Sequence, residues 1–438
     1  MSSVPPSERV AKEIDALLSV EERSEGANLA SELMRLGLQR LVQEALEQEV
    51  ARYLGRERYE RSGSGDGDGG TRPWRNGYKT RSIRTAEGRV PVQLPQVRNT
   101  PEPYRSELWP FLKGNSDALE ALVVEMYARG LSTRDIADAF RDRETGKKLL
   151  AKSQASQICH SLMEEYEAFA KRDLSSLDVV YLFLDAVYEP LRRTGRVKEA
   201  ILCCWGILSN GAKVLIHMDV ASSESYSVWK AFLTDLVNRG LPSPLTVTTD
   251  GAAGLTRAVE EVWGEAIRIR CWAHKMRNIL DKIPAEAHGE VKAFLSCIRD
   301  APDWATGRQL ANQFVKQYRH EYGRAIASFE DDLEASLAHL QLPAIHRRAV
   351  RTTNLLERAF VEERRRTKVI PRFMSESSGI KLIFATLWRV SLRWRGVRFS
   401  EHEQRQLAKV RERMRASLGN QPGDDPPTFQ REDQSTSA

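Results

Sequence analysis

Two aspartates in the middle of the chain each follow an apolar stretch. Asp185 ends the run that begins at Val179, and Asp250 ends the run that begins at Leu245. Short runs rich in β-branched and aromatic residues predict buried strands. The carboxyl ends of strands in an open α/β sheet are where ligand sites collect, so the two carboxylates would converge if their strands are neighbours. Two converging carboxylates repel each other unless a cation lies between them.

The chemistry predicted for this pair is binding of a divalent metal. Ligation by oxygen alone suits Mg²⁺, which is commonly held by one or two carboxylates together with substrate phosphate. A third carboxylate would complete a site for two ions about 4 Å apart, the arrangement used for in-line phosphoryl displacement. The alternative is structural, because strand-end aspartates also form turns or cap helices, and Asp250-Gly251 is a turn-prone dipeptide. The residues alone leave both readings open.

Cys271 and His274 follow a third short apolar run and are three residues apart. This spacing is half of a zinc site, but no second Cys/His pair stands at a suitable distance, so we do not expect structural zinc. The chain also lacks a G-x-x-x-x-G-K-[ST] loop, an H-E-x-x-H motif and a G-x-S-x-G motif. The common NTPases, zincins and serine hydrolases are thereby excluded, and no nucleotide cofactor is expected.

The elements that would position these residues alternate in a way typical of a mixed sheet flanked by helices. A helix is predicted from Ser225 to Gly240, and a turn at Ser209-Asn210-Gly211. A helical, strand-free block follows from Ile283 to Arg351. The predicted strands are Val179–Asp185, Ala200–Leu208, Lys213–Asp219, Leu245–Asp250 and Ile267–Cys271.

The last third of the chain is predicted to be helical. Thr352-Thr353-Asn354 should cap a helix that carries Glu357 in its first turns, and a final helix should run through Leu382 to Trp394. Gly419–Ala438 has the composition of a disordered tail. The aromatic anchors expected to pack the helical block are Trp304, Phe314, Tyr318 and Phe329.

The first hundred residues suggest helices followed by a small β-unit. Residues 1–25 are polar and predicted to be irregular, and an apolar stripe from Ala27 to Leu54 predicts one or two helices interrupted near Gly37. The stripe suits either a core face or a self-association seam, and we favour the core. Ser62–Thr71 is a glycine-rich linker. Asn76-Gly77 predicts a hairpin turn beside an alternating strand.

Asp117 to Ser161 has the order of a helix-turn-helix. A first helix should end at Gly130, a second should begin at the capping box Ser132-Thr133-Arg134-Asp135, and a third should begin near Ser153. The last helix of such a unit enters the major groove of DNA. An ordinary helical hairpin fits the same pattern.

Composition and charge limit the kinds of protein that this chain can be. Apolar residues make up 41% and charged residues 29% of the 438 residues, which is ordinary for a globular protein, and no apolar run approaches the length of a membrane span. We find no secretory signal, and five scattered cysteines indicate a reducing cytoplasm. Fourteen Lys or Arg but only four Glu lie between Gln341 and Ser400, although the whole chain carries only +6. Such a block attracts a polyanion such as nucleic acid, although a solvated helix face is the plain alternative.

From about Leu41 to Trp394 the chain resembles the Mutator-type transposases of the IS256 insertion-sequence family. The resemblance depends on the order and spacing of several short motifs, each weak by itself. They are Tyr59-Glu60-Arg61-Ser62, Arg75-Asn76-Gly77-Tyr78, Gly130-Leu131-Ser132-Thr133-Arg134-Asp135, Leu184-Asp185-Ala186-Val187-Tyr188, Arg239-Gly240-Leu241, Thr249-Asp250-Gly251 through Gly254-Leu255, Arg270-Cys271-Trp272-Ala273-His274-Lys275 with Arg277-Asn278-Ile279-Leu280, and Thr352-Thr353-Asn354-Leu355-Leu356-Glu357-Arg358.

The resemblance implies an RNase H-like catalytic domain with an all-helical insertion, preceded by a helical or helix-turn-helix DNA-binding region. It implies a catalytic and metal-binding triad of Asp185, Asp250 and Glu357, holding two Mg²⁺ ions for which Mn²⁺ should substitute. Cys271 and His274 would belong to the active-site region. The chain departs from the family at Glu189-Pro190, where a basic residue is usual, and the added carboxylate could alter substrate contacts or reduce activity.

The partners implied are double-stranded DNA, at the inverted-repeat ends and at the target, and a second copy of the chain in a homodimer or larger homo-oligomer. We expect no membrane association and a cytoplasmic, nucleoid-associated protein. The expected DNA contacts are Arg75, Lys79, Arg81, Arg134, Ser153, Gln154, Ser156, Gln157, Lys275, Arg277, Arg358, Arg364, Arg365 and Lys368.

The expected function is that of a DNA transposase that cleaves and joins strands by direct phosphoryl transfer. Two alternatives stay open: a catalytically silent, transposase-derived DNA-binding protein, and an RNase H-like nuclease that cuts without joining. The expected segments are 1–61 for N-terminal amphipathic helices (oligomerisation or DNA-end binding), 62–112 for the linker and basic β-unit, 113–173 for the helix-turn-helix region, 174–282 for the first part of the catalytic core, 283–351 for the helical insertion, 352–400 for the last core helices with Glu357, and 401–438 for a charged helix end and tail.

Overall fold

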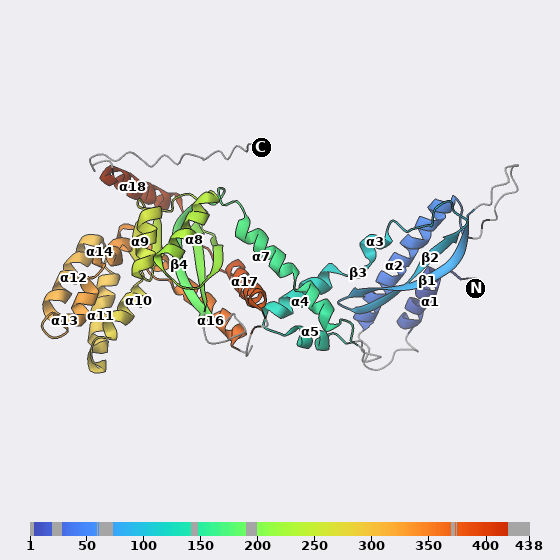
Figure 1. Cartoon of the computed structure of the whole chain (residues 1–438), viewed down its shortest axis with the longest axis horizontal. Helices are drawn as coiled ribbons and strands as arrows, with labels where there is room; N and C mark the ends of the chain where they lie inside the picture. Colours follow the sequence, from blue (N-terminus) through green and yellow to red (C-terminus); the bar gives the residue numbers. More distant parts are fainter. Residues whose placement is uncertain are drawn as a thin grey trace, which may run out of the picture. The chain divides into compact units, whose positions relative to one another are not determined.

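The computed structural model describes residues 4–19, 29–58, 60, 73–141, 148–189, 199–368, 373 and 375–418. Contacts divide the chain at Leu162 into two compact units, which are described separately (Figure 1). The expected linker Ser62–Thr71, the residue Pro190 and the expected tail Gly419–Ala438 lie outside the described residues. No helix among the described residues is long and apolar enough to cross a membrane.

The first unit begins with two helices packed on a mixed sheet. In the sheet, β1 (Trp74–Thr85) lies between its antiparallel neighbour β2 (Gly88–Arg98) and the short parallel strand β3 (Gly114–Asn115). Helix α2 (Leu29–Leu54) runs along β2, and α1 (Pro6–Leu18) packs on α2. The shared core consists of Val42, Leu46, Ile83, Val90 and Val92. Half of the eight apolar residues of the α2 stripe are buried, which agrees with the core role favoured above, whereas Leu41 is 66% exposed.

Three expectations for this unit are wrong. Residues 6–18 form a helix and are not irregular, because Pro6 stands at the first helical position and Val10 is buried. Helix α2 passes Gly37 without interruption. The Asn76-Gly77 pair lies inside β1, where the register with β2 shifts and Gly77 adopts a φ of 82°. A glycine there permits a bulge, whereas the hairpin turn falls at residues 86–87.

The three expected helices after residue 117 are present around a small core that includes Leu119, Val123 and Ile136. The capping box is confirmed: the Ser132 hydroxyl accepts from the Asp135 amide at 3.1 Å, and the Asp135 carboxylate accepts from the Ser132 amide at 3.2 Å. The helices of this region are α3 (Trp109–Leu112), α4 (Asp117–Ala128), α5 (Thr133–Ala139), α6 (Lys152–Ile158) and α7 (Ser161–Lys171), the last of which spans the boundary between the units.

The second unit is built on a five-stranded mixed sheet in the order β6-β5-β4-β7-β8. The β4, β5 and β6 strands are antiparallel neighbours, and β7 and β8 continue parallel to β4. Helices α8 (Tyr226–Asn238) and α9 (Ala253–Val262) bury Trp229, Leu233 and Val259 in a core shared with the sheet. The strands are β4 (Val179–Glu189), β5 (Glu199–Leu208), β6 (Lys213–Ala221), β7 (Thr246–Thr249) and β8 (Ile267–Arg270).

The strand-free block predicted after Ile283 is confirmed as helical, with its own core around Phe314, Tyr318 and Phe329. Trp304, also expected as an anchor, is 37% exposed at the start of its helix. The elements from β8 to the end of the block are α10 (Trp272–Leu280), η2 (Ala285–Ala287), α11 (His288–Arg299), α12 (Trp304–Tyr318), α13 (Gly323–Glu330), α14 (Leu333–Leu337), η3 (Ala338–Gln341) and α15 (Ala344–Val350).

Three helices follow the insertion: α16 (Asn354–Thr367), α17 (Glu376–Leu392) and α18 (Glu401–Leu418). Helix α16 contacts β4, and α17 contacts both α16 and β6. The expected last helix ends at Leu392, so Trp394 lies beyond it, where its ring packs 4.3 Å from that of Trp205 in β5.

Candidate active site at the ends of β4 and β7

Asp185 and Asp250 are brought together by the parallel pairing of β4 with β7. The last register pair is Phe183 with Thr248, so each aspartate lies two residues beyond it. The strands are neighbours, as the sequence argument required. Asp185 does not end its strand, however, because β4 continues to Glu189 by pairing with β5. The site therefore forms where β7 stops beside a longer β4.

Burial and charge both act on Asp185. Burial raises the pKa of its carboxyl to about 7, and the negative charge of Asp250 adds to the rise. His274, the Ala186 amide at 2.9 Å and the Thr353 hydroxyl favour the charged form and offset part of this effect. A nearby cation stabilises a carboxylate held in this way, because it offsets the cost of the buried negative charge.

Asp250 is held by a tight turn. Its Oδ1 accepts a hydrogen bond from the Ala252 amide at 2.9 Å, and Gly251 between them has a φ of 80°. The structural reading of Asp250 as a turn former therefore applies together with its position at the carboxylate pair. Glu224 is a further carboxylate here that the sequence argument missed, since burial and the charge of Asp250 raise its pKa.

Helix α10 places Cys271 and His274 between the aspartates and α16. Cys271 is the N-cap residue of α10, and its amide donates to the Thr249 carbonyl at 2.8 Å. The His274 Nε2 lies 3.9 Å from the Glu357 Oε1. The Cys271 side chain raises the pKa of His274, burial opposes this, and the charges of Asp185 and Asp250 add to the rise. The imidazole of His274, whose protonated form these groups favour, therefore lies among three acidic residues.

Thr353 was expected to cap α16, but its side chain makes no capping hydrogen bond. Its Oγ1 lies 3.4 Å from the Cys271 Sγ, its amide donates to the same sulfur at 3.3 Å, and its hydroxyl reaches Asp185. Burial alone would raise the pKa of the Cys271 thiol, but His274 and Thr353 outweigh burial and lower it. Thr353 thus joins the start of α16 to both β4 and α10.

We expect Thr353→Val to lower the DNA cleavage that the sequence resemblance implies by roughly tenfold, because the shape is kept while hydrogen bonds to a thiol and a carboxylate are lost. The rate on a cognate DNA end is the measurement. Thr352→Val, at the adjacent half-buried threonine, is the control and should stay near the wild-type rate. Equal cleavage rates for the wild type and the two variants would show that Thr353 has no role in the site.

The donor set suits the expected metal in its chemistry. It consists of carboxylates from two neighbouring strands and one helix, with the pKa of Asp185 already raised by burial and by Asp250. Within the described part of the chain, however, no three His, Cys, Asp or Glu side chains are grouped closely enough to ligate one ion. Glu357 faces His274, so side chains of the triad must move for it to close around a metal.

The sequence comparisons decide the family. A sequence model of "Transposase, Mutator family" matches residues 10–396. The chain belongs to the Mutator family of transposases. It is 32% identical over 362 residues to the transposase for insertion sequence element ISRM5 of Rhizobium meliloti, covering 82% of this chain and 88% of that protein. It is 33% identical to the IS406 transposase of Burkholderia multivorans (84% and 92% covered) and 28% identical to the IS256 transposase in transposon Tn4001 of Staphylococcus aureus (80% and 87% covered).

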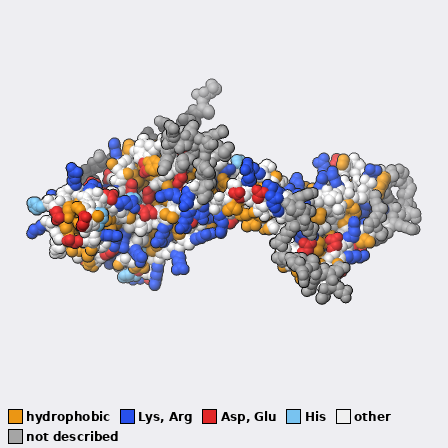
Figure 2. Space-filling view, turned by 90° about the horizontal axis from the view of Figure 1, so that it is seen from below, with side chains coloured by type: hydrophobic (Ala, Val, Ile, Leu, Met, Phe, Trp, Pro, Cys, Tyr) orange, Lys and Arg blue, Asp and Glu red, His pale blue; other side chains and the backbone are white. Residues whose placement is uncertain are grey.

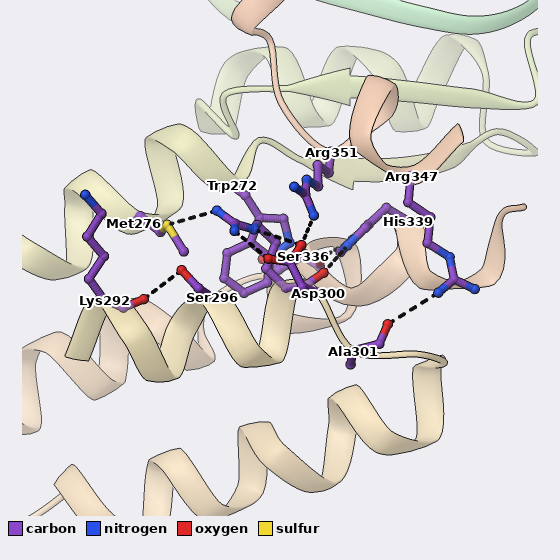
Figure 3. Close-up of polar contacts among 11 residues, drawn as sticks. Trp272, Met276, Lys292, Ser296, Asp300, Ala301, Ser336, His339, Arg347 and Arg351 are labelled. Carbon is purple, nitrogen blue, oxygen red and sulfur yellow. Dashed lines mark hydrogen bonds and ion pairs between the residues drawn. The ribbon is translucent and has the colours of Figure 1, made fainter. Parts of the chain in front are cut away.

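In this Mutator-family chain the helical insertion fixes the helix that carries His274 (Figure 3). The Trp272 indole donates to the Ser336 carbonyl at 2.7 Å, and the Trp272 amide donates to the Arg351 carbonyl at 2.9 Å. The two ring nitrogens of His339 lie 3.0 and 2.8 Å from the carbonyls of Ser336 and Arg299. Arg351 also pairs with Asp300. The start of α10 is therefore anchored at several points in the insertion.

The residues expected to contact DNA differ in their exposure. Many Lys and Arg side chains project from the larger unit, at the left of the space-filling view (Figure 2). Lys275 is not among the exposed ones, because it is 1% exposed and its Nζ donates to the Asp331 carbonyl. Arg365 and Arg366 both pair with Glu362, at 2.6 and 2.8 Å. The expected contacts of this unit that lie exposed are Arg277, Arg358, Arg364, Arg365 and Lys368.

In the first unit, two expected contacts serve the fold. Arg75 donates to the carbonyls of Arg56 and Glu57, at 3.0 and 3.1 Å. The Gln154 Oε1 accepts from the Ala151 amide and so caps α6. The expected contacts that lie exposed here are Lys79, Arg81, Arg134, Ser153, Ser156 and Gln157.

Proposed function

We propose that the protein is a DNA transposase that binds terminal inverted repeats and performs metal-dependent strand cleavage and strand transfer by direct phosphoryl transfer. The observation that carries this proposal is the pairing of Asp185 and Asp250 beyond the β4–β7 register, with Glu357 joined to them through His274. Membership of the Mutator family supports it. The sheet supports an RNase H-like core, since three antiparallel strands are followed by two that extend the sheet in parallel on the other side of the first.

The roles of the residues follow from their positions. Asp185, Asp250 and Glu357 would hold two Mg²⁺ ions, which Mn²⁺ should replace. When bound, such ions strengthen a water or 3′-hydroxyl nucleophile and neutralise charge that builds on the phosphate. His274 keeps Glu357 close to the aspartates, and Thr353 with Cys271 fixes the first turn of α16.

DNA binding is divided between the two units in this proposal. Residues 1–165 bind the inverted repeats, with the polar first turn of α6 in the major groove as in a helix-turn-helix. Residues 175–395 cut and join, with the exposed cations of α16 on the backbone beside the scissile bond. Pairing of two ends requires at least a homodimer, and such a DNA-bound protein would act in the cytoplasm at the nucleoid.

Strand transfer on oligonucleotides with cognate ends tests this function. Imperfect inverted repeats that flank the gene would supply the substrate. Joined products support the transposase, cleavage without joining supports an RNase H-like nuclease, and binding that needs no metal and gives no products supports a silent DNA-binding protein. The last two outcomes overturn the proposal.

We expect the affinity for cognate DNA to fall steeply with salt, by about 10³-fold between 50 and 200 mM if roughly six phosphates are neutralised. The double variant Arg364→Gln/Lys368→Gln should lower the slope of log affinity against log salt by about two. Lys316→Gln, an exposed lysine on α12, serves as the control and should keep the slope. A flat profile for the wild type would contradict binding through basic side chains.

A further inference from the structure

Arg270 is a buried cation beside the carboxylate pair, and the mechanism above does not use it. It is the last residue of β8 and pairs in register with Thr249, the residue before Asp250. The side chain is only 7% exposed. Its Nε and Nη1 are buried without a hydrogen-bond partner in the described part of the chain. Leaving a buried guanidinium unpaired is costly, so the position calls for an anion.

The guanidinium lies directly against Gly251. A Cβ at that glycine would come within 1.3 Å of the Arg270 Nη1 and 2.1 Å of its Cζ. Gly251 is therefore required twice: its φ of 80° makes the turn that holds Asp250, and its missing side chain leaves room for Arg270. The turn that presents the carboxylate thus also positions the cation.

The surroundings of Arg270 carry an excess of positive charge. Arg268 is already paired with Asp332, and its Nε lies 3.3 Å from Glu260. Lys275 is buried on the same side, where burial and the charge of Arg270 lower its pKa to about 8. The Lys275 amine bonds a backbone carbonyl, and the charges of Asp331 and Asp332 offset only part of the lowering of its pKa. No ion pair joins Arg270 to a carboxylate of the described residues, although Asp332 lies close enough for the two charges to interact. An anion supplied by a ligand would therefore complete the pairing of this guanidinium.

We propose that Arg270, supported by Lys275 and positioned by Gly251, binds one phosphodiester of the DNA next to the scissile bond. A guanidinium suits this ligand, because its planar N–H groups match two phosphate oxygens at once. The contact would hold the strand against Asp250, so Arg270 adds a substrate-binding group to the site. This inference rests on the proposed function for the identity of the anion.

The test compares Arg270→Met with the wild type in stability and in DNA binding. Because the substitution removes an unpaired buried charge and keeps the length of the side chain, the thermal midpoint of the DNA-free protein should stay the same or rise. Cleavage of a cognate end should fall at least tenfold, and Arg270→Lys should recover part of the rate. Lys316→Met, which removes an exposed cation from α12, is the control for loss of charge and should cleave normally.

Neutral methylphosphonates, placed singly along an uncleaved oligonucleotide in the absence of metal, identify the phosphate. At one position beside the scissile bond, the wild type should lose about tenfold in affinity, whereas Arg270→Met should lose nothing further there. This readout needs no cleavage, so it stands apart from a failure of the proposed function, which would appear as a wild type that binds and does not cut.

A wild-type rate for Arg270→Met would overturn the contact. So would a loss of activity that accompanies a lower thermal midpoint, or a methylphosphonate profile that is the same in both proteins. Stabilisation of the wild type by inorganic phosphate without any position-specific effect would also overturn it, because the site would then bind a free anion.

Discussion

Asp185→Asn, Asp250→Asn and Glu357→Gln should each lower cleavage at a cognate end by about 10³-fold or more. Each substitution keeps the size of the side chain but removes a negative charge from the proposed metal site, where Lewis-acid stabilisation is worth several kcal/mol. Binding of the uncleaved end should stay within a few fold, because the contacts that hold the DNA lie elsewhere. Gel-based cleavage and equilibrium binding on the same oligonucleotide measure the two effects. Cleavage retained by any one variant would show that the triad is misassigned.

The stability of Asp185→Asn shows whether Asp185 has a structural role in the folded protein. Burial raises the pKa of Asp185 from 3.8 to about 7, so its contribution to stability is full below pH 3.8 and is lost as the pH rises to about 7. At pH 8 the side chain is charged, and the folded protein carries the full cost of that buried charge. The variant should therefore unfold at an equal or higher temperature than the wild type at pH 8. An inactive protein that is at least as stable as the wild type separates a catalytic role from a structural one.

Glu363→Gln should raise the stability of the protein at alkaline pH. Glu363 lies on α16, is fully buried and faces Glu189 at the end of β4. Burial and the charge of Glu189 raise its pKa, while Thr367 and Arg364 offset part of the rise. The folded state therefore holds a proton that the unfolded state loses near pH 4.5, so stability is full below that pH and falls as the pH rises. At pH 8.5 we expect the variant to gain at least about 1 kcal/mol, or about 2–4 °C in Tm.

The neighbouring residue provides the matched control. Glu362 is partly exposed and paired with Arg365 and Arg366, and its hydrogen bond to Arg366 lowers its pKa. Its contribution has the opposite sign: it is present above the ordinary pKa of a glutamate and is lost as the pH falls. Glu362→Gln should therefore give no gain at pH 8.5. Melting curves of the three proteins from pH 5 to 8.5 measure these effects. If Tm depends on pH in the same way in the wild type and in Glu363→Gln, Glu363 does not hold a proton in the folded state.

Local sequence patterns predicted secondary structure correctly where a single physical cause determines it. The run from Val179 predicted β4 because burial on both faces demands continuous apolar residues. The capping box at Ser132 held because both of its hydrogen bonds are local. Asn76-Gly77 failed because pairing with β2 overrode the turn preference, and the glycine then formed a bulge. The end of β4 was placed too early because β5 extends it beyond the apolar run.

Much of the site could not be predicted, because it is formed by contacts between residues that are far apart in the chain. Thr353 looked like a helix cap, and its bond to Cys271 spans 82 residues, which no local pattern can report. Lys275 follows His274 among basic residues and looked like a DNA contact, but the packing of α10 on the insertion buries it. Arg270 begins one of the motifs that carry the resemblance, but the sequence did not indicate its role, because that role follows from its contact with Gly251. The convergence of Asp185 and Asp250 was predicted only on the condition that their strands are neighbours, and the structure meets this condition.

The helical insertion leaves the sheet and returns to it at almost the same point. Trp272, in the helix that precedes the insertion, and Arg351 at its end are joined by a 2.9 Å hydrogen bond, and the Thr353 amide donates to the Cys271 sulfur two residues later. A segment pinned at its base can change in length at little entropic cost, since closure entropy grows only slowly with loop length. We therefore expect the number of residues between Asp250 and Glu357 to vary among relatives, and the distance between the two side chains to be kept.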